Sequence, residues 1–114
     1  MMKIYGIKTC GSVRKAIGFM NSHNVDFEFV DLKTIKVDKS KIKEWASKVS
    51  LDILLNTKGT KYKTLRLKEL NLDDNSKLEW LEKENMLLKR PVIEFDDKLI
   101  VGYDEKIYQD IFVH

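Results

Sequence analysis

The stretch that decides the fold, residues 3–31, reads KIYGIKTCGSVRKAIGFMNSHNVDFEFVD. Residues 3–7 are short, apolar and β-prone, which is typical of a buried strand. Residues 25–31 mostly alternate between apolar and polar side chains, which indicates another strand. Between them, apolar residues at helical spacing predict an amphipathic helix that ends near residues 21–24; they are Val13, Ala16, Ile17 and Met20. This is a strand–helix–strand unit with parallel strands and a right-handed crossover.

The middle of the chain is predicted to be helical. One helix follows Asp38, with Ile42, Trp45, Ala46 and Val49 on one face, and another covers about 75–85. Leucines at helical spacing predict two short helices, over 51–55 and 65–70, with a turn at 56–60 between them.

The last part of the chain predicts a hairpin and a helix. The only proline, Pro91, opens a strand over 90–95, and a tight turn at 96–98 leads to an antiparallel strand over 99–102. Asp104 can cap a final helix, whose predicted buried face consists of Ile107, Tyr108, Ile111 and Phe112.

The order β-α-β, helices, β-β-α is that of an α/β protein with a thioredoxin-like fold. We therefore predict a four-stranded mixed sheet covered by helices, with an inserted helical subdomain over about 38–89. No repeat or Gly/Pro-rich linker marks a boundary, so residues 1–114 are predicted to form a single domain.

Composition excludes several classes of protein. The single cysteine, Cys10, excludes an internal disulfide framework, and two distant histidines, His23 and His114, leave no predicted metal site. The apolar runs are too short to cross a membrane, and residues 1–8 lack a secretory signal, so we expect a cytoplasmic protein. A formal net charge of +3 is small for a nucleic-acid binder, so no direct nucleic-acid binding is expected.

Cys10 is the candidate nucleophile. It lies in a polar loop at the predicted start of the first helix, where amide groups and the helix dipole favour a thiolate. The nearby cations Lys8, Arg14 and Lys15 act in the same direction. The alternative is an inert buried cysteine. Val13 occupies the place of a second cysteine, so a redox cycle requires an external thiol and a mixed-disulfide intermediate.

Two further places are candidates for binding. Pro91 is a candidate cis proline, and the planar guanidinium of Arg90 can bind an oxyanion or a carboxylate. The alternative for Arg90 is a surface ion pair with an acidic residue such as Glu94. Residues 58–68 hold five basic side chains and no acid, which indicates either a solvated surface or a surface for an anion or acidic partner.

Four blocks of the sequence, in the right order, resemble the arsenate reductase (ArsC) family, which includes the Spx-type transcriptional regulators and the YffB-type proteins. The blocks are Tyr5-Gly6-Ile7-Lys8-Thr9-Cys10 with Arg14-Lys15-Ala16, Leu54-Leu55-Asn56-Thr57-Lys58-Gly59-Thr60, Leu88-Lys89-Arg90-Pro91-Val92 and Val101-Gly102-Tyr103. The resemblance spans nearly the whole chain and implies a thioredoxin-like core with an inserted helical subdomain.

The resemblance also implies roles for single residues. Cys10 matches the nucleophile of the glutaredoxin-coupled arsenate reductases, and Arg90 matches one of their oxyanion-binding arginines. Asn56 and Gly102 stand where two other arginines would fall, so efficient arsenate reduction is not expected. Val13 replaces the second cysteine of the Spx redox switch, and residues 56–60 are most similar to the YffB type.

The leading functional hypothesis is an ArsC-family thiol oxidoreductase: a monothiol reductase with no bound cofactor and with glutathione as its co-substrate. Cys10 and Arg90 are the predicted catalytic residues, and the predicted substrate-binding residues are Lys8, Ser12, Arg14, Lys58 and Pro91. Glutathione or a glutaredoxin-like thiol is the expected electron donor. The alternatives are an Spx-like regulator that binds the RNA polymerase α-subunit, and a weak glutaredoxin-coupled arsenate reductase.

Overall fold

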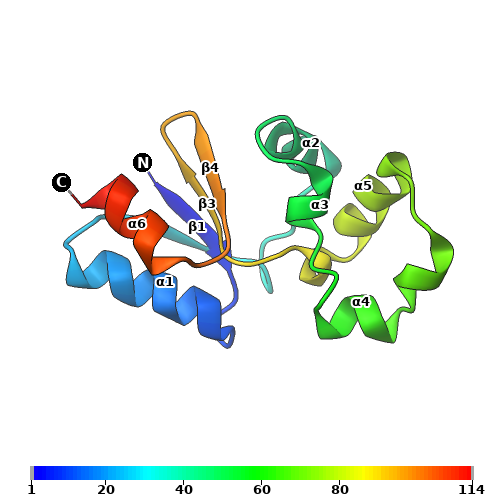
Figure 1. The fold of residues 1–114 in the computed structure, drawn as a ribbon, viewed down its shortest axis with the longest axis horizontal. Coiled ribbons are helices and arrows are strands. Elements are labelled where there is room, and N and C mark those ends of the chain that lie inside the picture. The colour runs from blue at the N-terminus through cyan, green and yellow to red at the C-terminus, as the bar shows by residue number, and fades with distance from the viewer. Residues whose placement is uncertain (1, 114) are drawn as a thin grey trace. The chain divides into compact units, whose positions relative to one another are not determined.

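Four short strands form one mixed sheet in the order β2-β1-β3-β4 in the computed structural model, which describes residues 2–113 (Figure 1). Strand β1 (Lys3–Gly6) runs parallel to β2 (Glu28–Asp31) and antiparallel to β3 (Val92–Phe95), and β3 forms a hairpin with β4 (Lys98–Val101). Helix α1 (Gly11–Ser22) connects β1 to β2, and α6 (Glu105–Phe112) follows β4. The predicted thioredoxin-like fold is therefore confirmed.

The chain divides into two compact units. The sheet unit consists of the described residues up to Thr34 and from Arg90 onwards. The helical unit, Ile35–Lys89, is inserted between β2 and β3 and contains the remaining elements. These are α2 (Lys39–Ala46), α3 (Leu51–Leu54), α4 (Thr60–Thr64), the 3-10 helix η1 (Leu67–Leu70), α5 (Asp74–Lys83) and the 3-10 helix η2 (Asn85–Leu87). A single domain over the whole chain stays a prediction.

Helices α1 and α6 lie on the same face of the sheet (Figure 1). The core there joins the paired residues Ile4 and Ile93 to side chains that both helices contribute. Those side chains are Ala16, Phe19, Met20 and Tyr108. The edges of the Phe19 and Tyr108 rings meet at a centroid distance of 5.5 Å, a favourable T-shaped geometry. Alternation along β1 and β3 turns Tyr5 and Val92, which are also buried, to the opposite face.

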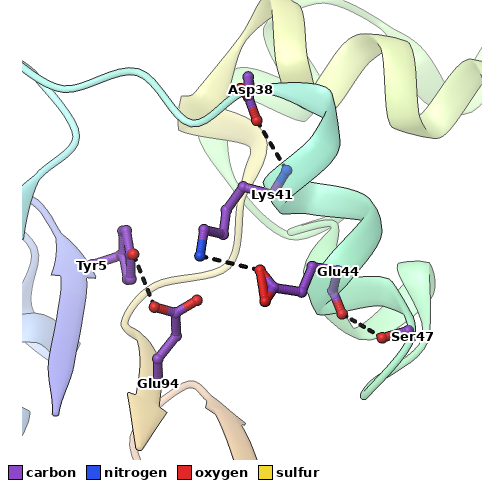
Figure 2. A network of polar contacts seen from close by, with 6 residues as sticks. All are labelled: Tyr5, Asp38, Lys41, Glu44, Ser47 and Glu94. Atoms are coloured by element: carbon purple, nitrogen blue, oxygen red, sulfur yellow. Dashed lines mark hydrogen bonds and ion pairs between the residues drawn. The ribbon is translucent and has the colours of Figure 1, made fainter. Parts of the chain in front are cut away.

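A polar contact crosses that opposite face. The hydroxyl of Tyr5 in β1 donates a hydrogen bond of 2.9 Å to Oε1 of Glu94 in β3 (Figure 2). The contact is partly buried and joins residues 89 positions apart in the sequence. It gives the Tyr5 hydroxyl the partner that a buried tyrosine requires.

The helical unit has its own core, and side-chain caps begin three of its α-helices. Asp38, Ser50 and Asp73 accept hydrogen bonds from first-turn amides of α2, α3 and α5. Figure 2 shows the cap on Asp38 and the ion pair of 3.1 Å between Lys41 and Glu44. The core side chains include Ile42, Trp45, Leu54, Leu67, Leu81 and Leu87. Each of these is nearly or completely inaccessible to solvent.

Asn85 is the one buried polar residue in the described part of the chain. Its Oδ1 accepts from the Val37 amide at 2.7 Å. Its Nδ2 donates to the carbonyls of Val37 at 3.2 Å and Leu81 at 2.8 Å. The segment before α2 is thereby fastened to the end of α5.

The structure corrects several predicted boundaries. The strand predicted over 25–31 begins only at Glu28, because Val25 donates to the Met20 carbonyl and Asn24 has a positive φ of 55° at the end of α1. The prediction for 56–70 is wrong in detail. Helix α4 starts at Thr60, within the predicted turn, and the left-handed conformation of Arg66 ends it before η1.

Two predictions of burial or extent also need correction. Ile107, predicted to belong to the buried face of the last helix, is 46% exposed because the rotation of α6 turns Tyr108 into the core instead. The helix predicted over about 75–85 starts at Asp74 and ends at Lys83, where the extended backbone of Glu84 begins η2.

Candidate functional site

Cys10 is the N-cap residue of α1 and ends the loop that follows β1. Its N–H donates to the Ile7 carbonyl at 3.2 Å, and its carbonyl accepts from the Arg14 N–H at 3.0 Å. The side chain is half-buried and makes no capping hydrogen bond. The first turn of α1 holds no acidic residue, and the amides at a helix start favour an anion. The predicted location at the helix start is confirmed, and the thiol is not sealed in the core.

Gly6 and Val13 fix where this helix begins. A Cβ atom on residue 6 would lie 2.5 Å from Cγ2 of Val13, which is inside van der Waals contact. Val13 is completely buried. Because residue 6 has no side chain, the first turn of α1 approaches the end of β1 closely. The loop that carries Cys10 is therefore short and tightly closed.

Arg14 fastens the same loop. Its Nε donates to the Lys8 carbonyl at 3.0 Å, and both residues are exposed. The structure thus gives Arg14 a contact to the loop backbone that sequence reasoning did not foresee. Ser12 is exposed on the first turn of α1. The loop and helix start that carry Cys10 therefore also carry Lys8, Ser12 and Arg14.

Arg90 and Pro91 lie at the start of β3, and the peptide bond between them is cis, as expected. The ladder between β1 and β3 ends at the pair of Tyr5 with Val92, so Gly6 and Pro91 are the next residues of the two chains beyond that end. Pro91 is buried, whereas Arg90 is half-buried with a buried Nε atom. The Arg90–Pro91 pair is therefore beside the end of β1 from which the Cys10 loop leaves.

A chain of hydrogen bonds connects α6 to this position. The completely buried hydroxyl of Tyr108 donates to the Gly102 carbonyl at 2.6 Å. The Gly102 N–H in turn donates to the Pro91 carbonyl at 2.8 Å. Burial raises the pKa of the Tyr108 hydroxyl, with smaller contributions from Tyr103 and Asp104. The sequence pattern assigned Tyr108 only to packing. A tyrosine at a core position of a helix needs a partner for its hydroxyl, and this was the signal for a buried hydrogen bond.

Gly102 stands where the arsenate reductases that the sequence resembles would have an arginine. It is buried and has φ 89°, in the left-handed region that side chains rarely adopt. An arginine there would be strained. Lys58 lies at an exposed turn of the helical unit, before α4, so it does not share a unit with Cys10. No group of three or more metal-ligating side chains gathers within residues 2–113, and His114 lies outside the described residues.

Within the same described residues, no helix is long and apolar enough to cross a membrane.

Fold and site together define a thioredoxin-like protein with a single cysteine at a helix start and a cis proline nearby. The model of the ArsC family matches residues 5–111, and the chain belongs to the ArsC family. It is therefore an ArsC-family thiol-redox protein.

Three similar proteins illustrate the range of the family. A solved structure of a protein named YFFB has a TM-score of 0.90 and 27% identity, over 96% of this chain and 97% of that one. An arsenate reductase (ArsC) related protein from Brucella melitensis has 32% identity and a TM-score of 0.79, over 99% of this chain and 95% of that one. The global transcriptional regulator Spx of Lactiplantibacillus plantarum is 26% identical, over 92% of this chain and 81% of that protein.

Proposed function

We propose that this protein is a monothiol reductase that acts through Cys10 and uses glutathione as its electron donor. The observation that carries the proposal is the half-buried Cys10 thiol at the start of α1, in a loop flanked by cations and by no first-turn acid. Cys10 thus lies beside the amides of the first turn of α1, and a cysteine sulfur is the nucleophile in thiol–disulfide exchange. Membership of the ArsC family supports the same chemistry.

The proposed cycle has two exchange steps. The Cys10 thiolate attacks the glutathione sulfur of a protein–glutathione disulfide, whose S–S bond breaks and whose protein thiolate leaves and takes up a proton. A second glutathione thiolate then attacks the mixed disulfide on Cys10, which releases oxidised glutathione and restores the Cys10 thiolate. In the net reaction the protein sulfur is reduced to a thiol and the incoming glutathione sulfur is oxidised, while the first glutathione sulfur stays at the disulfide level throughout.

An external thiol is needed because the chain has no second cysteine. Val13, three residues after Cys10, is completely buried under Gly6 and has no sulfur. The enzyme can therefore form only a mixed disulfide with another molecule. A glutaredoxin-like thiol is the alternative donor, and a reducing cytoplasm is the compartment in which either donor is available.

In this proposal Arg90 binds a carboxylate of glutathione, because a guanidinium pairs with a carboxylate through two parallel hydrogen bonds. The half-buried position of Arg90 next to Pro91 supports this role. The further candidates for contact with substrate, all in the same unit as Cys10, are Lys8, Ser12 and Arg14, and Pro91 shapes the docking edge. No bound cofactor is required.

The first test is mass spectrometry of the protein after incubation with oxidised glutathione. We expect one glutathione adduct on the wild type, none on Cys10→Ser, and loss of the adduct when reduced glutathione is added. A wild type that takes up no adduct would contradict the proposal.

The second test is steady-state reduction of a glutathione mixed disulfide. We expect Cys10→Ser to be inactive and Arg90→Gln to raise the KM for glutathione about tenfold, the loss of one charge-assisted contact. Arg66→Gln, which removes a guanidinium paired with Glu69 in the helical unit, is the matched control and should leave the KM unchanged. An equal KM in wild type and Arg90→Gln would remove Arg90 from the site.

A second candidate is a regulator that binds the RNA polymerase α-subunit, favoured by the similarity to Spx over 92% of this chain. A pull-down with the C-terminal domain of the α-subunit tests it. Retention by reduced protein and by protein carrying glutathione on Cys10 would be compared, and no retention in either state would eliminate this candidate.

A further inference from the structure

The helical unit contains a groove that the proposed chemistry of Cys10 does not use. It lies between α3, the α4–η1 segment and the start of α5. Figure 1 labels α3, α4 and α5, which all belong to the helical unit. Its volume is about 510 Å³, within the range of pockets that hold small organic molecules. Its lining consists of Asp52, Leu55, Thr57, Tyr62, Leu67, Lys68, Asn71, Leu72 and Lys77.

One part of the groove is apolar. Leu55 and Leu67 are almost completely buried, and Leu72 and the ring of Tyr62 are half-buried. The accessible apolar surface of the groove therefore comes from Leu72 and the Tyr62 ring, on which a planar apolar group can be desolvated. Thr57 and Asn71 add a hydroxyl and an amide to the lining, so the groove also offers polar contacts.

The two lysines of the groove differ in whether an acidic side chain pairs with them. Lys77 pairs with Asp52 at 2.6 Å, and this hydrogen bond raises the pKa of Lys77. Lys68 has no ion pair within the described part of the chain, although it lines the same groove. The one acidic residue of the lining, Asp52, is already occupied by Lys77. Lys68 therefore supplies a positive charge that nothing in the groove neutralises.

Two neighbouring cations of the same segment are paired, and a third does not line the groove, which distinguishes Lys68. Arg66 binds Glu69 at 2.8 Å, and Lys61 binds Glu84 at 3.8 Å. Lys63 is exposed on α4 but does not line the groove. The unneutralised charge at the groove thus comes from one identifiable side chain, next to an apolar surface.

We propose that this groove binds a small molecule that has a planar apolar body and one anionic group. Lys68 pairs with the anionic group, and the body lies on Tyr62 and Leu72, the half-buried apolar side chains of the lining. The site is independent of Cys10, because all of its residues belong to the helical unit. A carboxylate and a phosphate both meet this description, so the experiment includes one probe of each kind.

The test is a titration of the full-length protein, with ¹⁵N-labelled backbone amides observed by NMR. Phenyl phosphate and phenylacetate are the anionic probes, benzyl alcohol is the uncharged probe, and inorganic phosphate is the probe without an apolar body. We expect saturable shifts of the groove amides with at least one aromatic anion, and binding at least fivefold weaker for benzyl alcohol and inorganic phosphate. A preference between phenyl phosphate and phenylacetate would identify the anionic group.

Variants separate the groove from general surface charge. Lys68→Gln and Tyr62→Ala should each weaken binding of the preferred anion about tenfold or more, and Lys68→Arg should largely restore it. Lys63→Gln removes an equally exposed cation from the same segment and should change the affinity less than twofold. Equal losses in Lys63→Gln and Lys68→Gln, or equal affinity for inorganic phosphate and phenyl phosphate, would overturn the proposal.

Discussion

Val13 packs so closely on Gly6 that a Cβ atom at residue 6 would lie 2.5 Å from its Cγ2 atom. This contact joins the end of the central strand to the first turn of the helix that begins at Cys10. The position of the candidate nucleophile therefore depends on an absent side chain in β1.

Gly6→Ala is expected to destabilise the protein by about 1–3 kcal/mol, because one added methyl group overpacks a closed part of the core. Urea denaturation measures this loss. Gly18→Ala is the matched control: Gly18 also lies near Cys10 in sequence, within α1, but a Cβ there meets nothing within 4 Å. That change should stabilise the helix by about 0.5–1 kcal/mol.

A second variant tests whether the contact with Val13 is the cause. In the background of Val13→Ala, Gly6→Ala should cost clearly less than in the wild type, since the clashing methyl groups are gone. Additive losses in this double-mutant cycle would mean that residue 6 acts through another contact.

Tyr108→Phe is expected to lower the free energy of unfolding by about 1–3 kcal/mol, because it leaves the buried Gly102 carbonyl without its donor. The ring contacts with Phe19, Tyr103 and Phe112 should persist. Chemical denaturation at neutral pH measures the effect. An unchanged stability would show that the hydroxyl contributes nothing to the fold.

The buried Tyr108 hydroxyl also predicts that the stability of the protein depends on pH. Burial raises the folded-state pKa of Tyr108 above its ordinary value of 10.0, so the unfolded chain loses this proton first. The stabilisation is present below pH 10 and is lost as the pH rises above it. The stability of the wild type should thus fall more steeply above pH 10 than that of Tyr108→Phe. Parallel curves for the two proteins would contradict the assignment.

Asn85→Asp should destabilise the protein by about 2–4 kcal/mol. An aspartate keeps the acceptor for the Val37 amide but loses the two donors to the Val37 and Leu81 carbonyls, and it introduces a charge in a buried place. Thermal unfolding checks this. Asn75→Asp, at an exposed position in the first turn of α5, is the control and should be neutral or slightly stabilising.

Asp73 provides a test in acid. It caps α5 by accepting from the Ser76 amide at 2.8 Å, and hydrogen bonds from Ser76 hold its pKa below the ordinary 3.8. Its contribution is present above pH 3.8 and is lost as the pH falls through the lowered folded-state pKa. Asp73→Asn, which keeps an acceptor oxygen, should lose less stability at pH 7 than Asp73→Ala and should show a weaker acid dependence than the wild type. Equal losses in both variants at pH 7 would exclude the cap.

Much of the fold was predictable because it rests on local patterns. The period of the apolar residues predicted α1, and Asp38 and Asp104 predicted the starts of α2 and α6, which the structure confirms. The boundaries that failed depend on backbone conformation at single residues. Asn24 and Arg66 adopt positive φ without being glycine, and the sequence carries no strong signal of that.

The candidate site divides in the same way. The sequence alone determined that one cysteine starts a helix between two parallel strands, because strand period, helix period and turn residues act over a few positions. Tertiary structure decided which distant residues lie near the end of β1: the β1–β3 register pairs Tyr5 with Val92, the neighbour of Pro91, and the rotation of α6 brings Tyr108 to Gly102. It also decided that Lys68 lines a groove and Lys63 does not. Register and helix rotation follow from the packing of the whole core, so no short window of sequence specifies them.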